Sequence, residues 1–150
     1  MRKFEVVKKE FRKHEGDIIL PTRSDTGSAG YDFHTPCDFT IAPGETVHIV
    51  TDVKIAMEQD EVLLLFGRSS MGIKKRINLA TGVSVIDATF YGNDVNDGNL
   101  TIVLTSFSNE THHFVKGDKI AQGVFMKYLI TDDDNTTNTV RSGGIGSTGR

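Results

Sequence analysis

Hydrophobic residues occur along this chain in short runs that are rich in β-branched and aromatic side chains, a pattern typical of β-strands. Five runs stand out, at 4–7, 46–53, 62–66, 99–107 and 120–128. Turn-forming glycine, asparagine, aspartate and proline residues separate these runs, because such residues tolerate positive φ or bond to their own backbone. Short strands between regular turn signals predict a single all-β domain, either a sandwich or a barrel.

The segment Ser69–Ile77 is the only one with a helical pattern. Its first serines are placed to cap a helix, and Ile73 and Ile77 lie four residues apart. Gly72 lowers the helix propensity of the same segment. The pattern therefore predicts one short helix within the β domain.

The last residues of the chain, 135–150 (NTTNTVRSGGIGSTGR), break the strand pattern. Val140 and Ile145 are their only sizeable apolar side chains, and such a segment buries too little surface to order itself. The acidic run Asp132–Asp134 precedes it and marks a solvated linker. We expect residues 1–134 to form the β domain and residues 135–150 to form a flexible, glycine-rich arm.

Composition and charge narrow the range of partners. The chain has 150 residues, 17 Lys and Arg against 20 Asp and Glu, and a formal net charge of −3, so neither nucleic acid nor an anionic membrane is an expected partner. A lone Cys37 cannot form an internal disulfide, and the N-terminal residues lack the apolar run of a signal peptide. These features predict a soluble protein of the reducing cytoplasm. A domain of this size has modest room for a deep pocket, a shortage that oligomerisation would relieve.

Two separate segments have the residue types that bind phosphate. In the arm, four glycines can turn backbone N–H groups toward an anion, and Arg141, Ser147 and Thr148 add side-chain donors. In Gly67–Gly72, an arginine and two serines follow a strand and begin the predicted helix, where free N–H groups favour a phosphate. Each segment alone is equally compatible with a solvated tail or a helix cap.

Three further polar side chains are candidates for chemistry. Asp87 lies among apolar neighbours and would be able to take a proton from water, with Phe90 three residues later as a stacking surface; residues 82–94 have the outline of a hairpin. Asp32 follows small residues and could reach a hydrated Mg²⁺, and Gln122 in a predicted strand could bind a phosphate oxygen. A turn aspartate, a strand-edge aspartate and a solvated glutamine are the alternatives. The histidines lack the spacing of metal ligands.

Taken in chain order, these segments resemble the five motifs of the trimeric dUTPase family. The corresponding stretches are AGYDF at 29–33, GRSSMG at 67–72, GVSVIDATFYG at 82–92, GDKIAQ at 117–122 and RSGGIGSTG at 141–149. Their order, their spacing and the total length all agree with that family. The resemblance covers nearly the whole chain.

The resemblance implies a distorted jelly-roll that assembles as a homotrimer, with active sites at subunit junctions that are closed by the arm of a neighbouring chain. It implies hydrolysis of dUTP to dUMP and diphosphate with Mg²⁺. Asp87 would activate the attacking water, and Asp32 would help hold the hydrated metal ion. The implied substrate contacts are Arg68, Ser69, Ser70, Thr81, Val85, Ile86, Phe90, Gln122, Arg141, Ile145, Gly146, Ser147 and Thr148.

The implied contacts divide by the part of the nucleotide that they serve. Arg68, Ser69 and Gln122 would bind the phosphates, and the arm would close over the γ-phosphate. The segment 81–90 would hold the deoxyuridine, with its backbone reading the uracil edge and Phe90 packing on the deoxyribose. The chain departs from the family pattern at Phe90, where tyrosine is frequent, and at Ile145, where a phenylalanine usually covers the uracil.

Two alternative functions remain at this stage. dCTP deaminase shares the implied fold, but its chemistry needs a glutamate in a strand that here, at 100–107, has no carboxylate. A dUTP-gated regulator of a protein partner is the other alternative. Its partner would bind near 91–99, a stretch longer and more acidic than in compact members of the family and similar to inserts in Gram-positive and phage members, or near 132–134.

Overall fold

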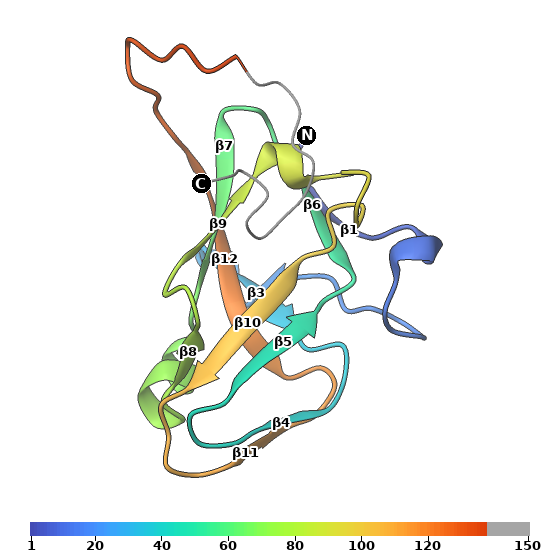
Figure 1. The fold of residues 1–150 in the computed structure, drawn as a ribbon, viewed down its shortest axis with the longest axis vertical. Coiled ribbons are helices and arrows are strands. Elements are labelled where there is room, and N and C mark those ends of the chain that lie inside the picture. The colour runs from blue at the N-terminus through green and yellow to red at the C-terminus, as the bar shows by residue number, and fades with distance from the viewer. Residues whose placement is uncertain (138–150) are drawn as a thin grey trace.

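The computed structural model describes residues 1–137 (Figure 1). Within that range the chain forms twelve strands and three helical turns. The strands are β1 (Lys3–Val6), β2 (Thr22–Arg23), β3 (Tyr31–His34), β4 (Phe39–Ile41), β5 (Thr46–Val50), β6 (Val53–Ala56), β7 (Glu61–Phe66), β8 (Ile77–Leu79), β9 (Ser84–Asp87), β10 (Thr101–Ser106), β11 (His112–Phe114) and β12 (Lys119–Lys127). The helical turns are η1 (Lys9–Phe11), η2 (Ser70–Lys74) and η3 (Ala88–Phe90). The all-β prediction is confirmed.

The strands form two principal antiparallel sheets around one core. The larger sheet has the order β2-β3-β12-β7-β9, and the smaller one has the order β5-β10-β8, with β1-β6 and β11-β4 as additional pairs. Figure 1 shows β5 and β10 in front of β12 and β3. Side chains of both sheets meet between them and are almost fully buried, among them Phe33, Leu63, Leu65, Ile102 and Leu104.

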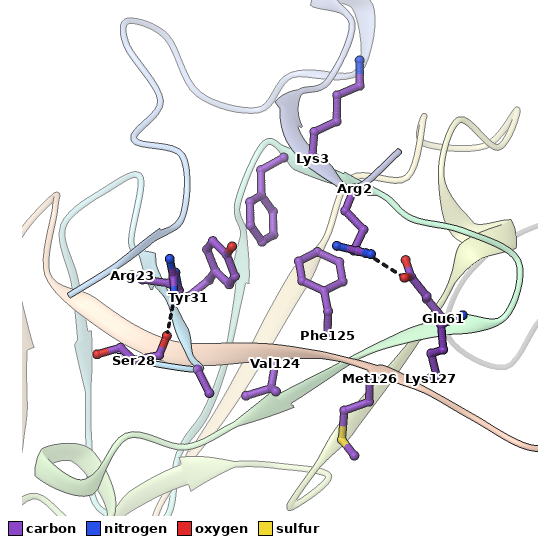
Figure 2. A pocket seen from close by; sticks show the side chains of 12 residues that line it. Arg2, Lys3, Arg23, Ser28, Tyr31, Glu61, Val124, Phe125, Met126 and Lys127 are labelled. Carbon is purple, nitrogen blue, oxygen red and sulfur yellow. Dashed lines mark hydrogen bonds and ion pairs between the residues drawn. The ribbon is translucent and has the colours of Figure 1, made fainter. Parts of the chain in front are cut away.

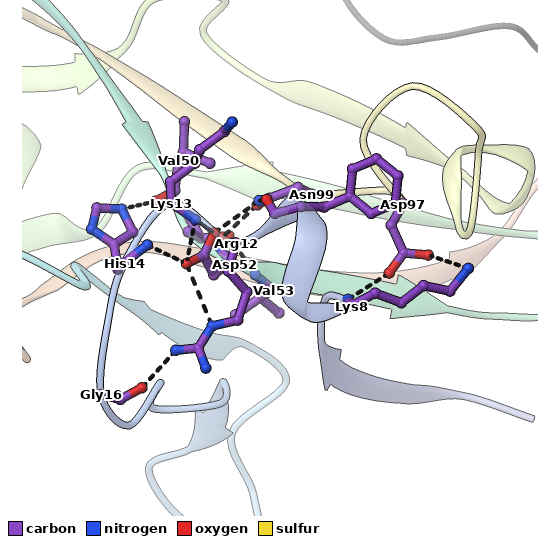
Figure 3. Close-up of polar contacts among 12 residues, drawn as sticks. Lys8, Arg12, Lys13, His14, Gly16, Val50, Asp52, Val53, Asp97 and Asn99 are labelled. Carbon is purple, nitrogen blue, oxygen red and sulfur yellow. Dashed lines mark hydrogen bonds and ion pairs between the residues drawn. The ribbon is translucent and has the colours of Figure 1, made fainter.

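The predicted strands are all present, but one of them is divided. The run 46–53 becomes β5 and the start of β6, which belong to different sheets. Between them Asp52 adopts a φ of 59° and is fully buried. Its carboxylate accepts hydrogen bonds from the backbone N–H groups of Lys13 and His14 and from the Asn99 amide, which compensates its burial (Figure 3).

The predicted helix over Ser69–Ile77 is wrong in extent. Only a single turn, η2, forms, and Ile77 instead begins β8, where it pairs with Ser106. Ile73 is 80% exposed whereas Ile77 is fully buried, so the two isoleucines do not share a buried face. The Ser69 side chain makes no capping hydrogen bond. Pairing of Ile77 with β10 overrides the weak helical pattern.

The hairpin predicted over residues 82–94 is also wrong. This segment contains one strand, β9, followed directly by the turn η3. The strand before it, β8, belongs to the smaller sheet, while β9 pairs with β7 in the larger one. Gly82, with a φ of 75°, turns the chain from one sheet to the other. The strand Ser84–Asp87 thus has its partner in β7, distant in sequence.

No helix within residues 1–137 is long and apolar enough to cross a membrane. The predicted arm lies mostly outside the described residues, which end at position 137.

Candidate functional site

Three neighbouring strands of the larger sheet bring together polar side chains that are far apart in the sequence. Asp32 on β3 pairs with Gln122 on β12, and Gln122 pairs with Phe66 at the end of β7. Arg68, Ser69 and Ser70 follow directly after that end. A cavity of about 570 Å³ opens there, lined by Ser24, Ser28, Ala29, Gly30, Asp32, Phe66, Arg68, Ser69, Ser70, Gln122 and Val124. Three of the predicted motifs therefore form one site.

The Gln122 side chain is fixed on both sides of its amide. Its Nε2 donates to the carbonyl oxygen of Gly67 at 3.1 Å, next to Arg68 in the chain. Its Oε1 lies against Gly30 so closely that a Cβ at Gly30 would stand 2.6 Å from that oxygen. Glycine at position 30 therefore permits the close approach of β3 to the glutamine, and Gln122 holds the backbone that leads into Arg68.

Asp32 is a buried carboxylate held by three donors. Its exposed fraction is 5%, and Arg68 Nε lies 3.0 Å from Oδ1, while Lys119 Nζ and Ser24 Oγ lie 2.7 Å and 3.0 Å from Oδ2. Burial by itself disfavours the charged form, but the hydrogen bonds from Lys119 and Ser24 and the charge of Arg68 outweigh it and lower the pKa of Asp32. The carboxylate is therefore ionised at neutral pH.

Arg68 is oriented by this carboxylate through Nε alone. Its terminal Nη1 lies 3.5 Å from the Ser70 hydroxyl, and the side chain lines the cavity. A guanidinium that lines a cavity together with two serine side chains is a suitable site for a phosphate group. The geometry of Arg68 and the two serines thus suits this end of the cavity to an anion.

The same carboxylate limits how a metal ion could bind. Within residues 1–137 no cluster of three or more acidic, histidine or cysteine side chains is arranged to hold a metal directly. A carboxylate accepts about four hydrogen bonds, and the three donors on Asp32 leave room for one more on Oδ1. Asp32 therefore fits a contact to a metal-bound water, and residues 1–137 offer no set of acidic, histidine or cysteine ligands that would complete a direct metal site.

Asp87 lies at the opposite end of the sheet from Arg68. It is exposed and pairs with Val62 near the start of β7, whereas Arg68 follows the end of that strand at Phe66. The four residues of rise from Val62 to Phe66 correspond to about 13 Å along the strand. One chain therefore does not bring Asp87 to the cavity that contains Arg68 and Gln122.

Comparison with known proteins decides the family of this chain. The dUTPase family model matches residues 16–149. The chain belongs to the dUTPase family. A deoxyuridine 5'-triphosphate nucleotidohydrolase from Lactococcus lactis is 41% identical, over 99% of this chain and 98% of its own length.

Solved structures of dUTPases have the same fold. The dUTPase of Streptococcus mutans is 34% identical, with a TM-score of 0.76, over 86% of this chain and 98% of its own. A point mutant of the dUTPase from a phage of S. aureus, described with a structural Mg(II) ion, is 20% identical, with a TM-score of 0.70, over 93% and 98% of the two chains. The second of these supports the fold only.

The other predicted residues of the dUTPase site fall into two groups. Thr81, Val85 and Ile86 lie around β9 with Asp87: Thr81 Oγ1 is 2.8 Å from Ser84 Oγ, Val85 is 61% exposed, and Ile86 packs on the core. Phe90 ends the turn η3 and is half-buried. The arm residues Arg141, Ile145, Gly146, Ser147 and Thr148 lie outside the described residues.

Sequence reasoning missed two residues of the Asp32 cluster. Lys119 lies in the fourth motif, GDKIAQ, and its basic charge was the available signal. Ser24 lies in the turn after β2, within a segment that resembles no motif, so the sequence offered no signal for it.

A second cavity, of about 610 Å³, lies beside the first and shares Ser28, Ala29 and Val124 with it. Figure 2 shows Tyr31 and Phe125 on its aromatic wall. Their ring centroids lie 5.1 Å and 5.5 Å from the ring of Phe4. The Arg2 and Glu61 side chains form an ion pair at 2.7 Å at one end. None of the predicted substrate contacts within residues 1–137 lines this space.

Proposed function

We propose that this chain is a dUTP pyrophosphatase that hydrolyses dUTP to dUMP and diphosphate. The observation that carries the proposal is that β3, β12 and β7 bring three family motifs to one cavity. There Arg68, Ser69 and Ser70 would bind phosphate oxygens, and Gln122 would hold the backbone that presents them. Charge neutralisation and positioning are what phosphoryl transfer chiefly requires of a protein.

In this proposal, Asp87 orients the attacking water and accepts its proton. The water oxygen forms a bond to the α-phosphorus of dUTP. At the same time the bond between that phosphorus and the oxygen that bridges to the β-phosphorus breaks, and diphosphate leaves. Mg²⁺ would be held mainly by the triphosphate and would neutralise its charge. Asp32 would contact one metal-bound water through the remaining lone pair of Oδ1.

The separation of Asp87 from Arg68 supports an active site built from two chains of a homotrimer. Val85, Leu64 and Val124 form a cross-strand row on the outer face of the larger sheet, and Val85 is 61% exposed. Asp87 lies on the same face, two residues along β9. A three-fold contact that covers this apolar row would bring Asp87 of one chain to the anion site of the next.

The remaining substrate contacts in the proposal come from β9, η3 and the arm. The backbone around Thr81, Val85 and Ile86 would read the uracil edge, and Phe90 would pack on the deoxyribose. The arm of another subunit would close over the bound triphosphate through Arg141, Gly146, Ser147 and Thr148, with Ile145 near the base. Its ordering on binding would exclude water from the site.

The two alternative functions differ in the support that the structure offers. β10 (Thr101–Ser106) has no carboxylate for a deaminase. A regulatory protein partner would bind the exposed part of 91–99, where Asp94 and Val95 face solvent.

We also infer a cytoplasmic location, for which the free thiol of Cys37 is suited.

A panel of dNTPs and UTP with Mg²⁺ tests the proposed activity, with release of diphosphate as the measurement. Hydrolysis of dUTP alone is the expected result. Release of ammonia from dCTP, or equal hydrolysis of all nucleotides, would contradict the proposal.

A further inference from the structure

The segment 91–99 is a compact, internally bonded loop that follows η3 directly. Asn93, Asp97 and Asn99 are buried, with exposed fractions of 8%, 1% and 3%. Asp94 and Val95, which lie between Asn93 and Asp97 in the sequence, face solvent. The loop therefore has an inner side that packs on the protein and an outer tip.

The Asn93 side chain joins this loop to the end of η3. Its Nδ2 donates to the Phe90 carbonyl at 2.7 Å and to Asn96 Oδ1 at 2.8 Å, and its Oδ1 accepts from the backbone N–H groups of Val95 and Asn96. Both donors and both acceptor positions of the amide are thus used. The Asn93 side chain therefore both closes the loop and holds the Phe90 backbone in place.

Gly98 approaches the same backbone from the other end of the loop. At its φ of 81°, an added Cβ would lie 2.8 Å from the Phe90 carbonyl oxygen and 3.0 Å from Tyr91 Cα. The Gly92 N–H also donates to the Asp97 carbonyl at 3.2 Å. The loop thus packs on the Phe90 backbone without space between them.

A buried ion pair anchors the loop to the body of the protein. Asp97 Oδ2 accepts from Lys54 Nζ at 2.9 Å. It also accepts from the Lys8 backbone N–H at 2.8 Å (Figure 3). Lys54 Nζ also lies 4.9 Å from the centre of the Tyr91 ring, and the Tyr91 hydroxyl donates to Glu5. Lys54 and Glu5 thereby connect β6 and β1 to the loop.

From these contacts we propose that Asn93 is a positioning residue for Phe90, and that the loop 91–99 sets how strictly the enzyme selects deoxyribose over ribose. The inference rests on the proposed function, in which Phe90 packs on the sugar. An apolar surface rejects an added hydroxyl by burying it without a partner, and this works only if the surface is held in place. Asn93 acts through the Phe90 carbonyl, with no contact to the substrate itself.

Asn93→Asp in the full-length protein separates this role from a role in loop folding. The aspartate keeps the oxygen that accepts from Val95 and Asn96, but it loses the N–H groups that donate to Phe90 and Asn96. The measurement is the ratio of kcat/KM for dUTP to kcat/KM for UTP. We expect this ratio to fall about tenfold or more, the size of effect that displacement of a substrate-positioning group produces. Asp94→Asn, at the exposed tip, is the matched control and should leave the ratio unchanged.

A double variant tests whether the effect passes through Phe90. Phe90→Ala should also lower the ratio, and adding Asn93→Asp to it should cause no further loss, because residues that act as one unit are not additive. Multiplying effects, or a wild-type ratio in folded Asn93→Asp, would overturn the inference. If Asn93→Asp does not fold, Asn93→Ser decides by the same criterion, since its short hydroxyl can bond within the turn but cannot reach Phe90.

A wild-type protein without dUTP hydrolysis would overturn the proposed function and this inference together. An active wild type with an unchanged dUTP-to-UTP ratio in the Asn93 variant would overturn only the inference.

Discussion

The Nε of Arg68 lies 3.0 Å from Oδ1 of the buried Asp32, which joins the second motif of the chain to the first. Lys119 and Ser24 hold the other carboxylate oxygen. The aspartate is thus held by two cations and a hydroxyl before any ligand binds. Its contact with Arg68 leaves the terminal nitrogens of the guanidinium available to phosphate.

Asp32→Asn should therefore weaken substrate binding more than it weakens folding. The amide cannot attract both cations, so Arg68 loses its fixed orientation, and we expect KM for dUTP to rise about tenfold or more. Lys119→Arg keeps the charge and should remain near wild type in KM. Steady-state kinetics at saturating Mg²⁺ make the measurement, and an unchanged KM in Asp32→Asn would contradict the orienting role.

Complementation between two inactive variants tests the two-chain active site. Asp87→Asn and Arg68→Ala should each be inactive alone. In trimers refolded from an equal mixture, about a quarter of the sites would combine an intact Arg68 from one chain with an intact Asp87 from the next. Recovery of about that share of wild-type activity is expected. A mixture as inactive as its components would indicate that each site is built within a single chain.

Asp87→Asn alone should separate binding from turnover. The amide retains the size of the carboxylate but does not accept the proton of the attacking water, so we expect kcat to fall by about 10² to 10⁴. The Kd for a non-hydrolysable dUTP analogue should stay within a few-fold of wild type. Substantial retained kcat would refute the role of Asp87 as the base.

Truncation before Arg141 should abolish catalysis and leave the oligomer intact. The arm supplies the donors that would close over the triphosphate, while the apolar row around Val85 lies in the β domain. Size-exclusion chromatography with light scattering reports the oligomer, and diphosphate release reports activity. A fully active truncated protein would show that closure by the arm is not required.

Acid stability should depend on the buried pair Lys54–Asp97. Burial of Asp97 opposes its charge, but hydrogen bonds from Lys54 and Lys8 outweigh this and lower its pKa below the unfolded value of about 3.9. The pair therefore stabilises the fold above that pH, and its contribution is lost as the pH falls through the folded-state pKa. Asp97→Asn should lower the free energy of unfolding by about 3 kcal/mol at pH 7. It should also lose less stability than wild type on acidification below pH ~4.

Urea unfolding at pH 7 and at a series of lower pH values measures both effects. Asp94→Asn is the control, because Asp94 belongs to the same loop and is exposed. If wild type and Asp97→Asn lose stability in parallel on acidification, the pair does not contribute as described.

The buried Asp97 also changes how the loop 91–99 is understood. The sequence marked this acidic stretch as a candidate partner surface, whereas Asp97 is an internal anchor and only Asp94 of its two aspartates faces solvent. Deletion of 94–97 would remove that anchor and would disturb Phe90 through Asn93. A search for a partner surface is better made by substitution of Asp94 and Val95.

Local pattern was sufficient for the strands with continuous apolar runs, such as β7 and β10, because burial on a sheet favours the same residues wherever the partner strand lies. It was insufficient for β8 and β9. Ile77 is a strand residue because Ser106 pairs with it, and Ser84–Asp87 form a strand because β7 lies beside them. Such pairings join residues that are distant in sequence, so a short window does not contain them.

The sequence by itself determined the fold class and, through the order of its five motifs, the family and the residue types of the site. Only the tertiary structure decided which of these residues meet in one chain. Strand register places Asp32, Gln122 and the residues after Phe66 side by side, and the same register puts Asp87 at the far end of β7. Register is fixed by the packing of a whole sheet face, so neighbours across strands are a property of the folded chain rather than of any segment within it.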